Sequence, residues 1–341
     1  MTAELAGSEI PVVLILYRRP SHTRRVFDAV RRARPRHLLL VADGPSPDGS
    51  EAAAVAGARA AVADVDWPCE VVRDYASQRM GCLGRVASGL DRAFTAWPAA
   101  IILEDDCVPE PGFFRFCVEL LERHRDDPRV MMVTGTNPLE EWGAGDAGYF
   151  FARQGFCWGW ATWRRAWRRF DPAPGRASDA RDLLIEHCGS AEQVDLHLDW
   201  LRRAVAGEID AWDVQWGHAC LLADGLAAVP VRNMVTNIGF GPDATHTRRK
   251  SLFDATRRAT PPSFPIVAPA AVTADRAFDR RVHEVRQGKP SVELLGEWVE
   301  RLLARDASAQ AIAAIVAGRK LHGDSPALAA LERRARAAAG L

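Results

Sequence analysis

The sequence predicts an α/β fold with a mostly parallel sheet flanked by helices, followed by a helical extension. Over the first 137 residues, short apolar runs alternate with amphipathic segments about every 25–30 residues, as in βαβ units. The apolar runs are nearly continuous, which is typical of strands covered on both faces. From about residue 291 the chain changes to Ala, Leu, Glu and Arg with a helical period.

The elements of the first half follow from these periods and from their turn residues. The first apolar run, 11–17, is followed by Pro20-Ser21, which suits the start of a helix that ends before Pro35. We expect strands at 11–17, 37–42, 69–72, 99–103 and 130–134. We expect helices at 21–34, 51–63, 84–97 and 113–124.

Composition excludes several classes of protein. Lys plus Arg and Asp plus Glu both number 44, so the formal charge is zero, which argues against a nucleic-acid binder. The seven cysteines form no C-x-x-C pair, which indicates reduced thiols. The N-terminus lacks the pattern of a signal peptide, and no apolar run approaches the ~18 residues of a membrane span. We therefore expect a cytoplasmic protein, and peripheral membrane contact stays open.

The second half is organised differently. Five of the eleven tryptophans lie within residues 142–170, either as a core cluster or as stacking surfaces for sugar rings. A Trp212-Asp213 motif follows, then an expected strand at 229–235 and a polar, glycine-broken loop at 236–247. We expect one domain over 1–287, with halves at 10–137 and 138–287. The helical extension, 288–341, suits docking or homo-oligomerisation.

The acidic run Glu104-Asp105-Asp106 follows the expected strand at 99–103. Packed carboxylates repel one another and require a counter-charge when buried, which a divalent metal bearing a phosphorylated ligand supplies. A solvated acidic turn is the alternative. Ligands of parallel sheets bind beyond the carboxyl ends of the strands. Other polar residues at the same predicted edge are Tyr17-Arg18-Arg19, Asp43-Gly44 and Arg73-Asp74.

Known nucleotide motifs narrow the chemistry. The chain has neither a G-x-x-x-x-G-K-[ST] loop nor a G-x-G-x-x-G after its first strand, which excludes P-loop ATPases and dinucleotide dehydrogenases. Metal-assisted chemistry on a diphosphate fits the acidic run, with a separate carboxylate as base.

On these residues the sequence resembles the metal-dependent GT-A glycosyltransferases, in particular bacterial relatives of N-acetylglucosaminyltransferase I. The resemblance spans roughly residues 10–285 and includes the motifs named above. It also rests on Gly81-Cys82-x-x-Arg85-Val86-x-Ser88-Gly89-Leu90, Gly159-Trp160, Trp212-Asp213 and the Asn237–Thr247 loop. It implies transfer of a sugar from a nucleotide diphosphate donor, with UDP expected, to a hydroxyl acceptor with inversion. The chain departs from these relatives at Gln78-Arg79-Met80-Gly81, where they tend to carry Asn-Leu-Gly.

On the donor side, the resemblance implies that Asp43 contacts the nucleotide base, with Tyr17 and Arg18 nearby. Glu104 and Asp105 would contact ribose, the donor sugar or metal-bound water, and Arg85 would reach the donor. Asp43 could instead only stabilise its Asp-Gly-Pro turn, and Arg85 could be a surface helix residue.

For the metal and the acceptor, the resemblance implies that Asp106 holds Mn²⁺ or Mg²⁺. His246 would ligate the metal or reach the diphosphate, or be a structural loop residue. Asp213 matches the catalytic base, although it could also be a helix N-cap. We expect the acceptor near Trp160 and Trp212. Two alternatives remain open: a sugar-phosphate nucleotidyltransferase, and a catalytically dead carbohydrate-binding protein.

Overall fold

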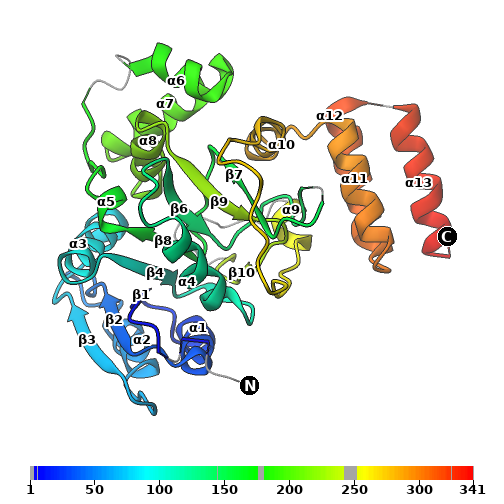
Figure 1. Ribbon diagram of the computed structural model, residues 1–341. Coiled ribbons are helices and arrows are strands. Elements are labelled where there is room, and N and C mark those ends of the chain that lie inside the picture. Colours follow the sequence, from blue (N-terminus) through cyan, green and yellow to red (C-terminus); the bar gives the residue numbers. More distant parts are fainter. Residues whose placement is uncertain are drawn as a thin grey trace. The chain divides into compact units, whose positions relative to one another are not determined.

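The computed structural model describes residues 4–5, 7–143, 145–175, 180–241, 252–323 and 325–340 (Figure 1). The chain divides into two compact units. The first comprises residues 1–248 and 258–276, and the second comprises 249–257 and 277–341. The boundary expected at residue 287 therefore falls inside the second unit. Each unit is described by itself.

The described part of the first unit contains a mixed eight-stranded sheet in the order β3-β2-β1-β4-β8-β6-β9-β7. Strands β3, β2, β1 and β4 are mutually parallel, as are β6 and β9, which confirms the α/β class and the mostly parallel sheet. The strands are β1 (Val12–Leu16), β2 (His37–Ala42), β3 (Glu70–Tyr75), β4 (Ala99–Glu104), β6 (Val130–Thr134), β7 (Tyr149–Ala152), β8 (Trp160–Trp163) and β9 (Leu226–Pro230).

Helices cover both faces of this sheet. Residues of β1 alternate between the faces, and Val12, Leu14 and Leu16 share one hydrophobic core with apolar residues of α1, α2 and α4. On the opposite face α3 packs so closely that a Cβ on Gly89 would lie 2.6 Å from Val41 Cγ1. These helices are α1 (Pro20–Ala33), α2 (Ala52–Ala61), α3 (Gly81–Ala96) and α4 (Phe113–Arg123).

The second half of the first unit departs from the expected pattern. β8 inserts between β4 and β6 and runs antiparallel to both. The strand expected at 229–235 is instead two strands, β9 and β10 (Val235–Asn237), because the chain turns at Asn233. The Asn233 side chain bonds the backbone of Asn137, Val235 and Arg258. β10 pairs antiparallel with β5 (Cys107–Pro109), which directly follows the acidic run.

The remaining helices of the first unit follow β8 in the chain. They are α5 (Arg164–Trp167), α6 (Arg181–Cys188), α7 (Ala191–Val205) and α8 (Asp213–Leu222). Leu184 of α6, Val194 of α7 and Leu221 of α8 form a small shared core. Residues 207–212 connect α7 to α8 and lead directly into Asp213.

The second unit is helical, as the composition of its sequence predicts. Trp298 is buried, its ring lies 4.5 Å from that of Phe253, and its Nε1 donates to Thr256 Oγ1 at 2.9 Å. The helices are α9 (Leu252–Thr256), α10 (Arg276–Arg286, beginning at the boundary), α11 (Val292–Leu303), α12 (Ser308–His322) and α13 (Pro326–Ala338). Across the residues that the structure describes, no helix has the length and apolar character needed to cross a membrane.

Candidate functional site

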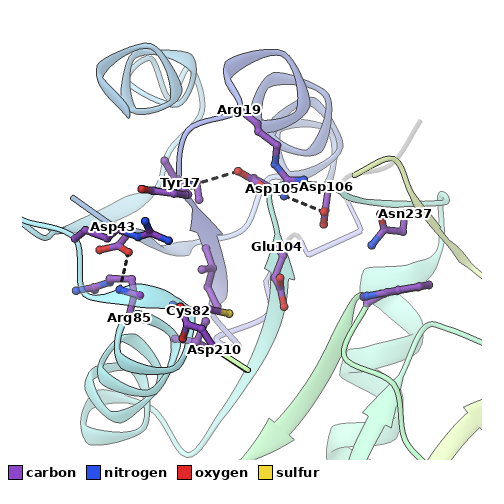
Figure 2. A pocket seen from close by; sticks show the side chains of 16 residues that line it. Tyr17, Arg19, Asp43, Cys82, Arg85, Glu104, Asp105, Asp106, Asp210 and Asn237 are labelled. Atoms are coloured by element: carbon purple, nitrogen blue, oxygen red, sulfur yellow. Dashed lines mark hydrogen bonds and ion pairs between the residues drawn. The ribbon is translucent and has the colours of Figure 1, made fainter. Parts of the chain in front are cut away.

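A cavity of about 160 Å³ lies at the carboxyl ends of β1, β2 and β4 (Figure 2). Its lining includes five carboxylates and three guanidiniums, so acidic groups predominate. The lining residues are Ile15, Leu16, Tyr17, Arg19, Asp43, Arg79, Gly81, Cys82, Arg85, Val86, Glu104, Asp105, Asp106, Trp158, Asp210 and Asn237. Polar residues from the ends of three of these strands, namely Tyr17, Arg19, Asp43 and Glu104–Asp106, therefore meet around one space.

Arg19 supplies a counter-charge to part of the acidic run. Its Nη2 lies 2.5 Å from Asp105 Oδ1 and 2.9 Å from Asp106 Oδ2, and both carboxylates are buried. These two charges raise the pKa of the Arg19 guanidinium against the opposing effect of its burial. Asp105 Oδ2 also accepts the Tyr17 backbone N–H at 3.2 Å. Both Asp105 oxygens are thus engaged, and they join the β1–α1 turn to the end of β4.

Glu104 lacks such a partner. Among the described residues its side chain forms no ion pair, and its carboxylate points away from Arg19 (Figure 2). Burial, followed by the charges of Asp106, Asp213 and Asp105, raises the pKa of Glu104 to about 8. At neutral pH the Glu104 carboxyl is therefore largely protonated, because neither Arg19 nor another cation stabilises its charged form.

The segment that follows β10 lies directly against Asp106. The Ile238 N–H donates to the Asp106 carbonyl oxygen at 2.8 Å, and Gly239 N–H donates to Asn237 Oδ1 at 2.7 Å. A Cβ on Gly239 would lie 1.9 Å from Asp106 Oδ2 and 2.7 Å from Arg19 Nη1. Only glycine therefore fits beside this carboxylate and its arginine. His246, further along this loop, lies outside the described residues.

Two carboxylates accept hydrogen bonds from the backbone N–H groups at the N-terminus of α3. Asp43 accepts from the N–H groups of Met80 at 2.8 Å and Gly81 at 3.1 Å, and also from Gly44 at 2.8 Å. Asp210 accepts from the N–H groups of Cys82 and Leu83. Asp43 thus has the turn-stabilising role that the sequence left open, while its side chain still lines the cavity.

Arg85 is buried at the cavity wall rather than exposed on a helix surface. Its Nη2 pairs with Asp74 Oδ2 at 2.5 Å, and its buried Nε has no hydrogen-bond partner among the described residues. Asp74, near the end of β3, thus holds the guanidinium of a side chain that lines the cavity.

Arg18 does not reach the cavity, contrary to the expectation that it lies beside the nucleotide. Its side chain pairs with Glu51 at the start of α2, which also accepts from the Tyr17 hydroxyl. Burial and this bond raise the pKa of Tyr17 to about 12. Arg19, one residue later, lines the cavity instead and pairs with Asp105 and Asp106.

The structure also corrects the expected roles of Trp160 and Trp212. Their rings stack on each other at 5.3 Å, and both side chains are buried in a cluster with Trp167 and Trp216. An indole without an exposed face cannot stack on a sugar. Trp158 lines the cavity instead, with its ring against Phe240.

Asp213 is the first residue of α8 and is exposed. It does not line the cavity itself, yet its charge contributes to the raised pKa values of Glu104 and Cys82, which do. Asp213 therefore lies close enough for its charge to act on two lining residues, although it is not part of the lining.

The cavity residues fit a hard divalent cation that takes most of its ligands from water and from the phosphates of a bound nucleotide. Within the described ranges, no three His, Cys, Asp or Glu side chains form a complete metal site. The donors near Asp106 are carboxylate oxygens, which Mn²⁺ and Mg²⁺ prefer, and a bound cation would favour the ionised form of Glu104.

Several lining residues received no role from the sequence, namely Arg19, Arg79, Cys82, Trp158, Asp210 and Asn237. Of these, Arg19 was placed at the sheet edge, and Cys82 and Asn237 lie in motifs of the resemblance. Arg19 had a signal, since a buried acidic run requires a cation near it. Arg79 also had one, because it falls in the segment where the chain departs from the relatives that it resembles.

Comparisons with known proteins include a distant likeness to a solved structure. No family model matches the chain, and no curated protein matches it. Among solved structures, it is similar to the mannosyltransferase PcManGT from Pyrobaculum calidifontis in complex with GDP-Man and Mn²⁺. The identity is 15%, the TM-score is 0.32, and the match covers 97% of this chain and 80% of that chain. A TM-score this low supports no conclusion about this chain.

Proposed function

We propose that the chain is a GT-A type glycosyltransferase that moves a sugar from a nucleotide diphosphate donor, with UDP expected, to a hydroxyl acceptor. The observation that carries the proposal is the meeting of Asp43, Arg19 and the Glu104–Asp106 run around one cavity at the carboxyl edge of a parallel sheet. Ligands of such sheets bind at this edge.

The donor side combines anion-binding and cation-binding groups. Arg19, Arg79 and Arg85 line the cavity and suit a diphosphate, whose oxygens accept charge-assisted hydrogen bonds. Asp106 would hold Mn²⁺ or Mg²⁺, with Glu104 beside it. The metal, when bound, would neutralise the charge that develops on the departing diphosphate. Asp105 supports this arrangement by holding Arg19 and the Tyr17 backbone in place.

The acceptor side would lie between Trp158 and Asp213. Trp158 provides an aromatic surface in the cavity wall, and Asp213 provides an exposed carboxylate whose charge acts on Glu104. In our proposal Asp213 removes the proton from the acceptor hydroxyl, whose oxygen then attacks the anomeric carbon from the face opposite the diphosphate. A single displacement of this kind inverts the anomeric centre.

A screen of nucleotide sugars with Mn²⁺ tests the proposal by measuring release of nucleoside diphosphate, with sugar and polyol acceptors added. We expect release with at least one donor, an inverted product by NMR, and loss of at least a hundredfold in turnover for Asp213→Asn. A retained anomeric configuration would contradict the single displacement. Pyrophosphate release from a nucleoside triphosphate and a sugar phosphate would favour the nucleotidyltransferase instead.

A further inference from the structure

Helix α3 has no N-cap of its own. Its cap position is Met80, whose side chain makes no capping hydrogen bond, and Gly81 follows at φ +82°. The first N–H groups of a helix require acceptors, which a local Ser, Thr, Asp or Asn normally supplies. In this chain the acceptors for Cys82 and Leu83 come from Asp210, at 2.8 and 3.0 Å.

Asp210 belongs to the connection that leads into α8. It is separated by 128 residues from Cys82 and by only three from Asp213. A Cβ on Gly81 would lie 2.9 Å from Asp210 Oδ2, so glycine at this position allows the close approach. The bond therefore joins the first turn of α3 to the start of α8.

The residues between Asp210 and Asp213 are held as well. Ala211 is buried in a small core with Leu201 and Val214, and Trp212 is stacked on Trp160 of β8. Asp213 thus begins a helix whose first residue is held to β8 through Trp212 and to α3 through Asp210. Both β8 and α3 adjoin β4, the strand that ends in the acidic run.

We propose that Asp210 is a positioning residue that, by capping α3, fixes where Asp213 stands relative to the acidic run. The part of this inference that concerns catalysis rests on the proposed function. The mechanical part does not, because it states only that the first turns of α3 and α8 are coupled through one carboxylate.

Hydrogen exchange tests the mechanical part without any assay of activity. In Asp210→Ala we expect amide exchange to rise about tenfold in residues 80–86 and also in 213–218, with α1 unchanged. Ser190→Ala is the matched control, because Ser190 caps α7 in the same half through Gln193 N–H at 3.3 Å. A rise confined to residues 80–86 would reduce Asp210 to a simple helix cap and overturn the proposal.

Gly81→Ala provides a second route to the same contact with the Asp210 charge retained. We expect it to reproduce the exchange pattern of Asp210→Ala, because its Cβ displaces the carboxylate. Gly84→Ala, one turn further along, is its control, since a Cβ there meets only Met80 Cβ at 3.6 Å. If Gly81→Ala leaves residues 213–218 unchanged, the coupling is absent.

Turnover tests the catalytic part. Asp210→Ala should lower kcat about tenfold to a hundredfold, a larger factor than any change in the Kd for the donor, since a misplaced base affects chemistry more than binding. In an Asp213→Asn background the same substitution should have no further effect on kcat. Independent, multiplying losses would contradict the positioning role. An inactive wild-type protein would refute the proposed function, and the exchange experiment would still decide the coupling.

Discussion

Arg19 donates to Asp106 through Nη2 at 2.9 Å, and the same nitrogen reaches Asp105. The charges of Asp105 and Asp106, the last two residues of the acidic run, are therefore partly neutralised by Arg19. This pairing explains how the fold tolerates two buried carboxylates side by side. Glu104 has no such cationic partner, and its pKa is raised to about 8.

The Arg19 pairing predicts a stability effect. Arg19→Met would leave Asp105 and Asp106 buried without a cationic partner, and breaking such a pair costs about 3 kcal/mol of unfolding free energy. Urea denaturation measures the loss. Arg31→Met is the control, because its pair with Asp66 is exposed and should cost well under 1 kcal/mol. Equal losses in the two variants would mean that Arg19 does not compensate the acidic run.

Gly239 should tolerate no side chain. Gly239→Ala places a Cβ 1.9 Å from Asp106 Oδ2, and relieving that overlap should cost about 1–3 kcal/mol and displace the Asp106 carboxylate. Thermal unfolding with and without Mn²⁺ measures both effects. In Gly217→Ala, in the interior of α8, the added methyl meets no atom within 4 Å, so that variant should be neutral or stabilised by up to about 1 kcal/mol. A Gly239→Ala protein as stable as Gly217→Ala would contradict the prediction, because it would show that the backbone at residue 239 moves away from Asp106 at little cost.

Two tryptophans should respond in opposite ways. Trp160→Ala removes a fully buried ring from the aromatic cluster and should cost about 3–5 kcal/mol of unfolding free energy. Trp158→Ala should cost far less stability but weaken ligand binding, because Trp158 lines the cavity. Denaturation curves and ligand titrations on both variants separate the effects. Undiminished binding by a stable Trp158→Ala protein would remove that ring from the site.

The pH dependence of stability should carry a contribution from His218. Burial lowers the pKa of this imidazole, which contacts His197 at 3.2 Å and faces the charge of Asp171. Below its unfolded pKa of about 6.5 the unfolded chain binds a proton that the folded chain does not, so this group destabilises the fold on acidification. His218→Phe should therefore cost more stability at pH 7.5 than at pH 5.5, by up to about 1.4 kcal/mol.

The quantity to measure is the difference in unfolding free energy between His218→Phe and wild type at each pH. The raised pKa of Glu104 acts in the opposite direction, because a folded carboxyl that takes up a proton more readily gains stability on acidification. The total slope thus mixes both groups. A cost of His218→Phe that does not change with pH would contradict the account of this residue.

The sequence predicted the first half of the sheet and the edge at which several of its polar strand ends meet. Short continuous apolar runs in an α/β protein are typical of parallel strands buried on both faces, so the strands ending at Tyr17, Asp43 and Glu104 were recognisable. Parallel pairing brings their carboxyl ends together. The short strand Trp160–Trp163 was not recognisable, because so short and mostly apolar a segment suits a core loop equally well. Its insertion between β4 and β6 is what buries Trp160.

Contacts between distant segments were the part that sequence reasoning could not supply. Asp210 caps a helix 128 residues away and leaves no pattern around itself. The indirect signal was at α3, which begins at Gly81 without a capping residue before it. Arg18 and Arg19 are adjacent and chemically identical, so only the direction of the turn decides which one faces Asp106.

The central claim is that this acidic cavity binds a nucleotide diphosphate sugar together with a divalent metal. Calorimetric titration of UDP- and GDP-sugars into the full chain, with and without Mn²⁺, tests it most directly. Asp106→Asn is the variant, and Asp126→Asn, an exposed acid on the chain segment after α4, is the control. We predict Mn²⁺-dependent binding of at least one donor that Asp106→Asn loses and Asp126→Asn keeps. Binding that persists in Asp106→Asn, or no binding of any nucleotide sugar, would contradict the account.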